Sequence, residues 1–168
     1  LGNGYACTAC IGKKEIMNAA QDTFISSTFW TERIGPTAAL KTLEVMERIK
    51  SWETITEKGQ NLRKSIKKIA NKYSLKIKCS GIPSLGGYSF ISNNQNKYKT
   101  YITQEMLKHN FLASTSCYIS IAHTDSIIKE YLDILDPIFS TISKCEDGMS
   151  IDEILEVPEA HTGFSRLN

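Results

Sequence analysis

The hydroxyl cluster Ser-Ser-Thr at residues 26–28 is the part of this 168-residue chain whose residue types come closest to ligand chemistry. It precedes an apolar pattern that predicts a helix from about Thr31, with Glu32 in its first turn and Pro36 early enough to be tolerated. Hydroxyls beside the free N–H groups of a helix start suit a phosphate ester. The same residues are typical of a turn that caps a helix, and residue types alone favour the capping turn.

The cysteines and histidines form no recognisable catalytic or metal-binding set. Cys7 and Cys10 make a CxxC pair, but no second pair follows at zinc spacing, so both are interpreted as buried structural thiols. The odd total of five cysteines argues against a disulfide framework and favours a reducing, cytoplasmic compartment. His109, His123 and His161 stand alone and are interpreted as structural. No catalytic residue and no metal ligand is therefore assigned.

Composition narrows the classes of partner. Hydrophobic residues make up 41% and charged residues 23% of the chain, as is typical of globular proteins. The 20 basic and 18 acidic residues leave a net charge of +2, too small to favour nucleic acid or a membrane surface. No apolar run approaches the ~20 residues of a membrane span. We expect no nucleic-acid partner and no membrane partner.

Residues 53–168 carry the pattern of a small α+β domain. Helical spacing of apolar side chains and alternation of apolar with polar ones separate the expected helices from the expected strands. The helices are expected at 62–73, at 98–109 and from the N-cap Thr124, and the strands at 75–80, at 88–92 and, broken, at 111–122. The capping box SIDE at 150–153 predicts a short last helix. This order favours a mostly antiparallel sheet covered by helices on one face.

Residues 1–35 do not belong to this α+β layer and do not complete a domain by themselves. The pattern predicts a turn at Gly2-Asn3-Gly4, a short buried strand at 5–11 and a long helix from about residue 31 to 50. One strand and a few turns cannot bury a core. We therefore expect this stretch to be the end of a larger domain whose beginning lies outside the sequence.

Four segments together resemble one known family. They are LGNGY at the start, SSTFWTERIGPTAAL at 26–40, ITQEMLKHNFLASTSCYISIAHTDSIIKEYLDIL at 102–135 and HTGFSRLN at 161–168. The combination resembles the C-terminal portion of class III, fold type I, pyridoxal-phosphate aminotransferases, nearest to the glutamate-1-semialdehyde aminomutase-like members. The resemblance covers essentially the whole chain. It implies an α/β fold in which residues 1–52, with the long connecting helix, end the cofactor-binding large domain and residues 53–168 form the small α+β domain.

The resemblance implies an active site shared between the subunits of a homodimer. The cofactor would be pyridoxal 5'-phosphate, and the lysine that binds it would stand two residues before Leu1, so the chain would hold no catalytic residue. Thr28, with Ser27 beside it, would contact the cofactor phosphate of the other subunit. Asn3 and Tyr5 would line the substrate pocket, although Tyr5 is equally compatible with simple packing.

The activity implied is amino-group transfer from a small-molecule donor to a carbonyl acceptor, with this chain inactive alone. The aminomutases carry an acidic residue where Thr115 aligns, which puts the mutase reaction in doubt. Thr115 and Ser116 either face the substrate or merely interrupt a strand. Two alternatives remain. One is a glutamate-1-semialdehyde 2,1-aminomutase of tetrapyrrole synthesis. The other is a stand-alone α+β binding module, which would expose no apolar surface on residues 1–50.

Overall fold

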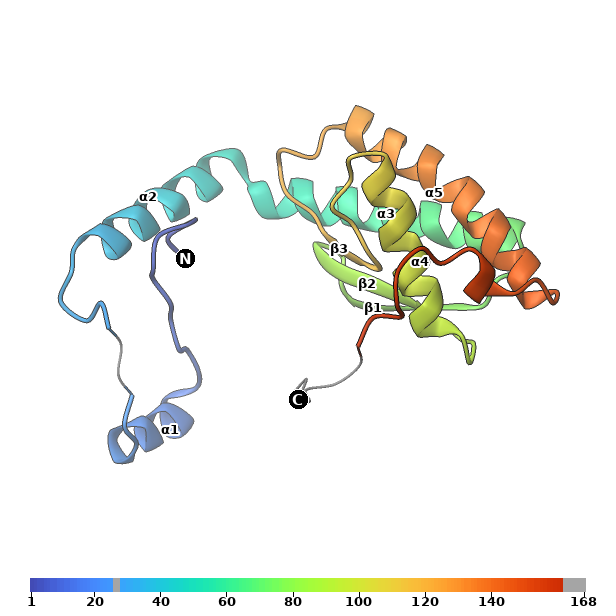
Figure 1. Cartoon of the computed structure of the whole chain (residues 1–168). Coiled ribbons are helices and arrows are strands. Elements are labelled where there is room, and N and C mark those ends of the chain that lie inside the picture. The colour runs from blue at the N-terminus through green and yellow to red at the C-terminus, as the bar shows by residue number, and fades with distance from the viewer. Residues whose placement is uncertain (26–27, 162–168) are drawn as a thin grey trace. The chain divides into compact units, whose positions relative to one another are not determined.

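The computed structural model describes residues 1–25 and 28–161, which fall into two compact units, Leu1–Ser51 and Trp52–Asn168. Figure 1 shows the helices and strands of both units. Among the described residues, no helix combines the length and the apolar character needed to cross a membrane.

The first unit consists of two short helical turns and one long helix. These are α1 (Lys14–Met17), the 3-10 helix η1 (Asn18–Asp22) and α2 (Ile34–Ile49). Helix α2 confirms the expected long helix but begins three residues later than expected, and it ends because Lys50 adopts a left-handed φ of 48°. The expected buried strand at 5–11 is wrong. Those residues are mostly exposed, because the described part of this unit offers them no sheet to join.

The second unit is built on an antiparallel sheet of the strands β1 (Ile77–Ile82), β2 (Leu85–Phe90) and β3 (Ser116–Tyr118), in that order. Cys79 lies opposite Tyr88, and Gly86 lies opposite Cys117. Alternation then divides the side chains between two faces. Tyr88 and Phe90 are buried on one face, whereas Leu85 and Tyr118 are exposed on the other. The antiparallel sheet is confirmed, and the broken strand at 111–122 shrinks to three residues.

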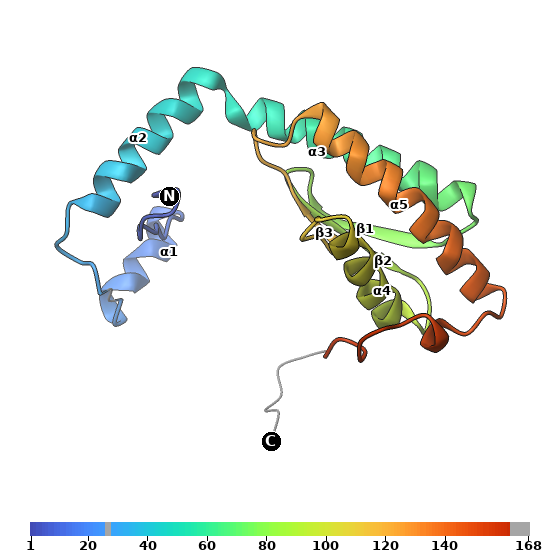
Figure 2. The same cartoon turned by 45° about the horizontal axis from the view of Figure 1, so that its top comes forward.

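Three helices cover the buried face of the sheet, as expected. They are α3 (Ser51–Lys72), α4 (Gln95–Lys108) and α5 (Asp125–Glu146), followed by the 3-10 helix η2 (Ile151–Glu153). All three place buried apolar side chains in one cluster with β2. Figure 2 shows the backbone of these helices and of the sheet. At its centre, the ring of Phe90 lies 5.3 Å from that of Phe139 and 5.4 Å from that of Tyr98, both edge to face.

The two expected N-caps have different outcomes. Thr124 Oγ1 accepts a hydrogen bond from the Ile127 amide at 3.3 Å, so the cap of α5 is confirmed. Ser150 makes no side-chain cap, and the capping box at 150–153 is wrong. The segment forms only the three-residue turn η2, which is too short to set up the reciprocal bonds of a capping box.

The turn between β1 and β2 docks directly on α3. A Cβ added to Gly59 would lie 2.0 Å from the Pro83 carbonyl oxygen, so only glycine permits this approach. One turn further along α3, Arg63 Nη2 donates to the carbonyl oxygens of Ser80 at 3.0 Å and Gly81 at 2.8 Å. The hairpin is therefore fixed to the helix by close backbone contact and by a cation that satisfies its carbonyls.

Gly59→Ala tests this contact because the expected change in stability is opposite in sign to the usual effect of replacing a helical glycine by alanine. In an open helix position, alanine is about 1 kcal/mol more favourable than glycine. Here the added methyl overlaps Pro83, and we expect a loss of about 1–3 kcal/mol of unfolding free energy. Urea denaturation measures it, with the exposed neighbour Gln60→Ala as the control that should change stability little. A stabilised Gly59→Ala variant would show that the hairpin does not rest on α3.

Candidate functional site

The expected turn at the start of the chain is present. The Tyr5 amide donates to the Gly2 carbonyl at 3.2 Å, and Asn3 and Gly4 between them have φ values of 48° and 106°. Two successive positive φ angles are those of a type I′ turn, for which Asn-Gly is the favoured pair. Asn3 and Tyr5 are both exposed on this turn, and Tyr5 lines a pocket together with Ile34 and Thr37 at the start of α2.

Thr28 lies in a turn ahead of α2 with its side chain exposed. Ser27 falls outside the described residues. Helix α2 begins six residues later, and its Gly35 amide already donates a hydrogen bond to Glu32 Oε1 at 3.1 Å. Glu32 therefore caps the helix rather than lying inside its first turn. A phosphate at Thr28 would be bound by the exposed hydroxyl and the amides of its own turn, not by the start of α2.

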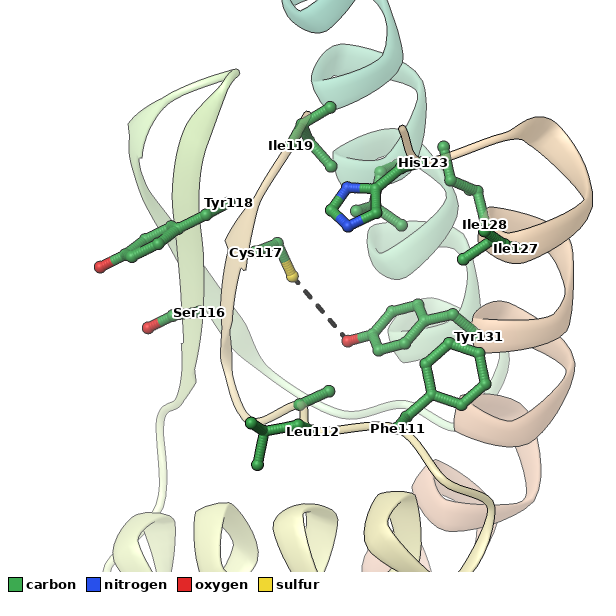
Figure 3. A pocket seen from close by; sticks show the side chains of 12 residues that line it. Phe111, Leu112, Ser116, Cys117, Tyr118, Ile119, His123, Ile127, Ile128 and Tyr131 are labelled. Atoms are coloured by element: carbon green, nitrogen blue, oxygen red, sulfur yellow. Dashed lines mark hydrogen bonds between the residues drawn. The ribbon is translucent and has the colours of Figure 1, made fainter. Parts of the chain in front are cut away.

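The second unit places Thr115 and Ser116 at the start of the edge strand β3. The Thr115 carbonyl accepts from the Tyr88 amide at 3.0 Å, and Ser116 lies opposite Gly87. Thr115 is half-buried and Ser116 is exposed. Figure 3 shows the side chains of Ser116 and Tyr118 pointing away from Tyr131, while Cys117 points toward it. Ser116 therefore belongs to the uncovered face of the sheet.

A pocket of about 310 Å³ lies along β3, and its lining includes Ser116 and Tyr118 as well as Cys117 (Figure 3). Its walls come from α3, the segment after α4, β3, the loop before α5 and the first turns of α5. The lining residues are Leu62, Phe111, Leu112, Ala113, Ser116, Cys117, Tyr118, Ile119, His123, Ile127, Ile128 and Tyr131. None of these is Asp, Glu, Lys or Arg, so the pocket suits an uncharged apolar group and not a phosphate. The sequence patterns did not indicate this pocket, because its walls come from separate elements.

The polar groups at the floor of this pocket stay neutral. Cys117 Sγ and Tyr131 Oη lie 3.8 Å apart, and the buried Tyr88 hydroxyl near them makes no hydrogen bond of normal geometry with the described residues. Burial raises the pKa of the Tyr88 and Tyr131 hydroxyls and of the Cys117 thiol. A thiol with a raised pKa is a poor nucleophile. These side chains therefore shape the interior rather than carry out acid–base or nucleophilic chemistry.

The cysteine and histidine side chains of the described residues form no catalytic or metal-binding centre. Cys7 is half-buried and Cys10 is exposed, so the prediction that both are buried is wrong. His123 Nδ1 accepts from the Ser120 amide at 3.1 Å, which is a structural role. The described residues contain no group of three or more His, Cys, Asp or Glu side chains placed to hold a metal ion.

The first unit exposes an unusual amount of apolar surface. Phe24 is 94% exposed, Ile11 90% and Trp30 73%, and the outward side of α2 adds Leu40 at 71%. In this unit only Gly2, Gly35, Ala39 and Ser51 are buried among the described residues. Exposed apolar surface of this extent indicates an interaction surface. It contradicts the stand-alone module, which required residues 1–50 to expose no such surface.

Comparison with known proteins finds that the chain is similar to aminotransferases and aminomutases. The chain is 30% identical over 131 residues to the 3-aminobutyryl-CoA aminotransferase of Cloacimonas acidaminovorans, covering 74% of this chain and 32% of that enzyme. It is 25% identical over 142 residues to the aminopentol aminotransferase of Sphingopyxis macrogoltabida, covering 83% and 34%. It is 23% identical over 159 residues to a glutamate-1-semialdehyde 2,1-aminomutase of Polynucleobacter necessarius, covering 84% and 37%. The chain thus spans about a third of the length of the curated relatives that it matches.

The fold also has a counterpart among solved structures. The PLP internal aldimine form of the Sphingopyxis sp. MTA144 FumI protein matches with a TM-score of 0.66 and 22% identity, over 86% of this chain and 36% of that one. No protein-family model matches the chain. The structural match shows the fold, and the relatives above show the kinship.

The buried hydroxyls and thiol predict a specific dependence of stability on pH. Their raised pKa values mean that the folded state keeps these protons while the unfolded chain releases them above about pH 8.5–10. Stability is fully present below that range and falls as pH rises, by up to about 1.4 kcal/mol per pH unit for each group. Tyr131→Phe should make this alkaline loss shallower. Denaturation from pH 7 to 11 measures it, with the exposed Tyr118→Phe as control. Equal slopes in both variants would contradict the burial argument.

Proposed function

Because the chain is homologous to class III pyridoxal-phosphate aminotransferases and glutamate-1-semialdehyde aminomutases, we propose that it is the C-terminal part of such an enzyme. The longer protein would transfer an amino group from a small-molecule donor to a carbonyl acceptor. Residues 1–52 would end the cofactor-binding large domain, and residues 53–168 would form the small domain. The observation that supports this proposal most strongly is the set of relatives, which match the chain over about a third of their own length.

The cofactor proposed is pyridoxal 5'-phosphate, which when bound supplies an electron sink for the substrate carbanion. Thr28 would bind its phosphate, and the exposed hydroxyl in the turn before α2 fits that role. Ser27 would assist. The Gly2–Tyr5 turn would orient the residues before it and present Asn3 and Tyr5 to the substrate. The pocket behind β3 has no charged lining side chain, which favours the Thr28 turn as the phosphate site.

A homodimer would explain why the first unit exposes so much apolar surface. Phe29 and Trp30 directly follow Thr28, and they are 52% and 73% exposed. Burying them against a second copy, or against the rest of the longer chain, would place Thr28 beside that contact. We propose that Thr28 contacts the cofactor of the partner subunit, and that the enzyme works in the cytoplasm, where its five free cysteines stay reduced.

The aminomutase is the second candidate because several relatives carry that name. Against it stands Thr115, which has no carboxylate and lies half-buried at the start of β3. Of Thr115 and Ser116, the two residues of the second unit proposed to face the substrate, Ser116 is the better placed, since it is exposed. An assay of the full-length protein for 5-aminolevulinate formation decides between the two. Clear turnover would make the mutase the function.

Mixed dimers test the shared site most sharply. One full-length variant carries Thr28→Ala, and the other lacks the upstream lysine proposed to bind the cofactor. If Thr28 acts across the interface, a mixed dimer regains one complete site, and random mixing restores roughly a quarter of wild-type activity. Ser26→Ala in place of Thr28→Ala is the matched control and should start from near-normal activity. No recovery on mixing would place Thr28 in its own subunit's site or outside the site.

Thr28→Ala should also weaken cofactor binding directly. Losing one hydrogen bond to a charged group should lower affinity roughly 10- to 100-fold without changing the fold. Equilibrium dialysis of the full-length dimer against pyridoxal phosphate measures this. In the same assay the 168-residue chain alone should develop no stoichiometric visible absorbance. Unchanged affinity in the variant would remove Thr28 from the site.

A further inference from the structure

Helix α4 carries a polar stripe that contacts a distant segment of the chain. Asn96, Thr100, Gln104 and Lys108 recur every fourth residue and therefore lie along one side of the helix, here called the α4 ladder. All four contact residues 154–160, here called the strap. Figures 1 and 2 both show the strap, in red after η2, running beside α4. The strap lies antiparallel to the helix, since Lys108 meets its beginning and Asn96 meets its end.

The ladder contacts mainly the backbone of the strap. Gln104 Nε2 donates to the Ile154 carbonyl at 3.1 Å, while its Oε1 accepts from the Glu156 amide at 2.7 Å. One carboxamide thus pairs with the backbone much as a neighbouring strand would. Thr100 Oγ1 accepts from the Ala160 amide at 3.0 Å, and Asn96 donates to the Ala160 carbonyl. Contacts of this kind select an extended main chain and not a particular side chain.

Two carboxylates of the strap also contact the α4 ladder, one through an ion pair and one through a hydrogen bond. Lys108 Nζ lies 2.5 Å from Glu156 Oε1, and Asn96 Nδ2 donates to Glu159 Oε1 at 2.7 Å. Just before the strap, Lys97 pairs with Asp152 at 2.7 Å. The ladder and its flanking lysine therefore favour an acidic segment over a basic one.

Only the first two residues of the strap pack apolar side chains against the core. Ile151 is 4% exposed, and Ile154 and Leu155 are half-buried against the core cluster. From Glu156 to Ala160 every residue is exposed, so that stretch is held by polar contacts with α4. Surface ion pairs and hydrogen bonds of this type are individually weak and screened by salt. Under the strap, however, Thr100 and Gln104 are buried and need hydrogen-bond partners whenever they are covered.

We propose that the α4 ladder is a binding site for an extended acidic peptide, occupied in the free chain by its own strap, and that residues 156–160 leave it while the core stays folded. The trans ligand has the chemistry of the strap itself: an extended backbone with carboxylates at two positions three residues apart. This proposal does not depend on the enzymatic function. It assigns to α4 a peptide-recognition role in addition to its place in the core.

Hydrogen exchange of the full chain tests the release. The Glu156 and Ala160 amides should exchange at least about tenfold faster in 0.5 M salt, while the Leu155 amide, bonded to the Ile151 carbonyl, and the α5 amides should not change. Lys108→Gln should have the same effect at low salt. Lys99→Gln removes the same charge from an exposed position of α4 and should have none. If the amides of residues 156–160 exchanged at the same rate as the α5 amides, the strap would not open separately, and the proposal would be overturned.

A labelled peptide of residues 150–160 tests the site itself. The double variant Glu156→Lys, Glu159→Lys should free the ladder, and fluorescence anisotropy should then show saturable peptide binding that weakens in 0.5 M salt. The parent chain, with its site filled, should bind at least about tenfold more weakly. Adding Gln104→Ala to the double variant should abolish binding, and adding Lys99→Gln should not. Failure of the double variant to bind, or binding that ignores Gln104→Ala, would overturn the proposal.

Discussion

The ring of Phe90 packs edge to face against Phe139 and Tyr98, and this contact commits one face of the sheet to the helices. Tyr88, two residues earlier on the same strand, points the same way and packs 5.8 Å from Phe139. Helices α3, α4 and α5 therefore gather on a single face, and the opposite face stays open. The exposed position of Ser116 on the open face and the neutral pocket behind β3 are both consequences of this division.

The second unit has a hydrophobic core, whereas the described part of the first unit has none. In the first unit, large apolar side chains such as Phe24 and Trp30 face outward. A stretch of this kind is stabilised by surfaces that it meets elsewhere. In the longer enzyme proposed above, the rest of the chain or a second subunit would supply such surfaces. The exposed Thr28 lies within this stretch. The proposed contact of Thr28 with the partner's cofactor therefore requires the proposed dimer.

The existence of the helices was predicted better than the irregular segments, although α3 begins at Ser51, eleven residues before the expected start at 62. The apolar residues of α3 and α5 repeat at helical spacing, and burial of one helix face imposes that pattern directly. The segment YACTACI has the composition of a strand, but a strand needs a neighbour, and no pattern within 1–52 supplies one. The beginning of β2 at Leu85 was missed because its glycines resemble a turn. They are instead small residues that permit close contact with Arg63 and Thr115.

For the site, the sequence indicated chemistry where hydroxyls cluster but could not place it. Thr28 and Ser116 are exposed as a ligand contact requires, whereas the helix start expected at about Thr31 lies at Ile34, where the Gly35 amide already donates to Glu32. The α4 ladder was invisible for a different reason. A polar stripe on a helix predicts a face exposed to solvent. The strap itself has neither the helical nor the alternating pattern of apolar residues that would predict a packed element.

Mapping the covalent cofactor position in the full-length protein tests the central claim most directly. The protein would be loaded with pyridoxal phosphate, reduced with borohydride, digested and analysed by mass spectrometry. The account predicts one pyridoxyl adduct per subunit, on a lysine upstream of Leu1. A stoichiometric adduct on a lysine within residues 1–168, or no adduct at all, would contradict it.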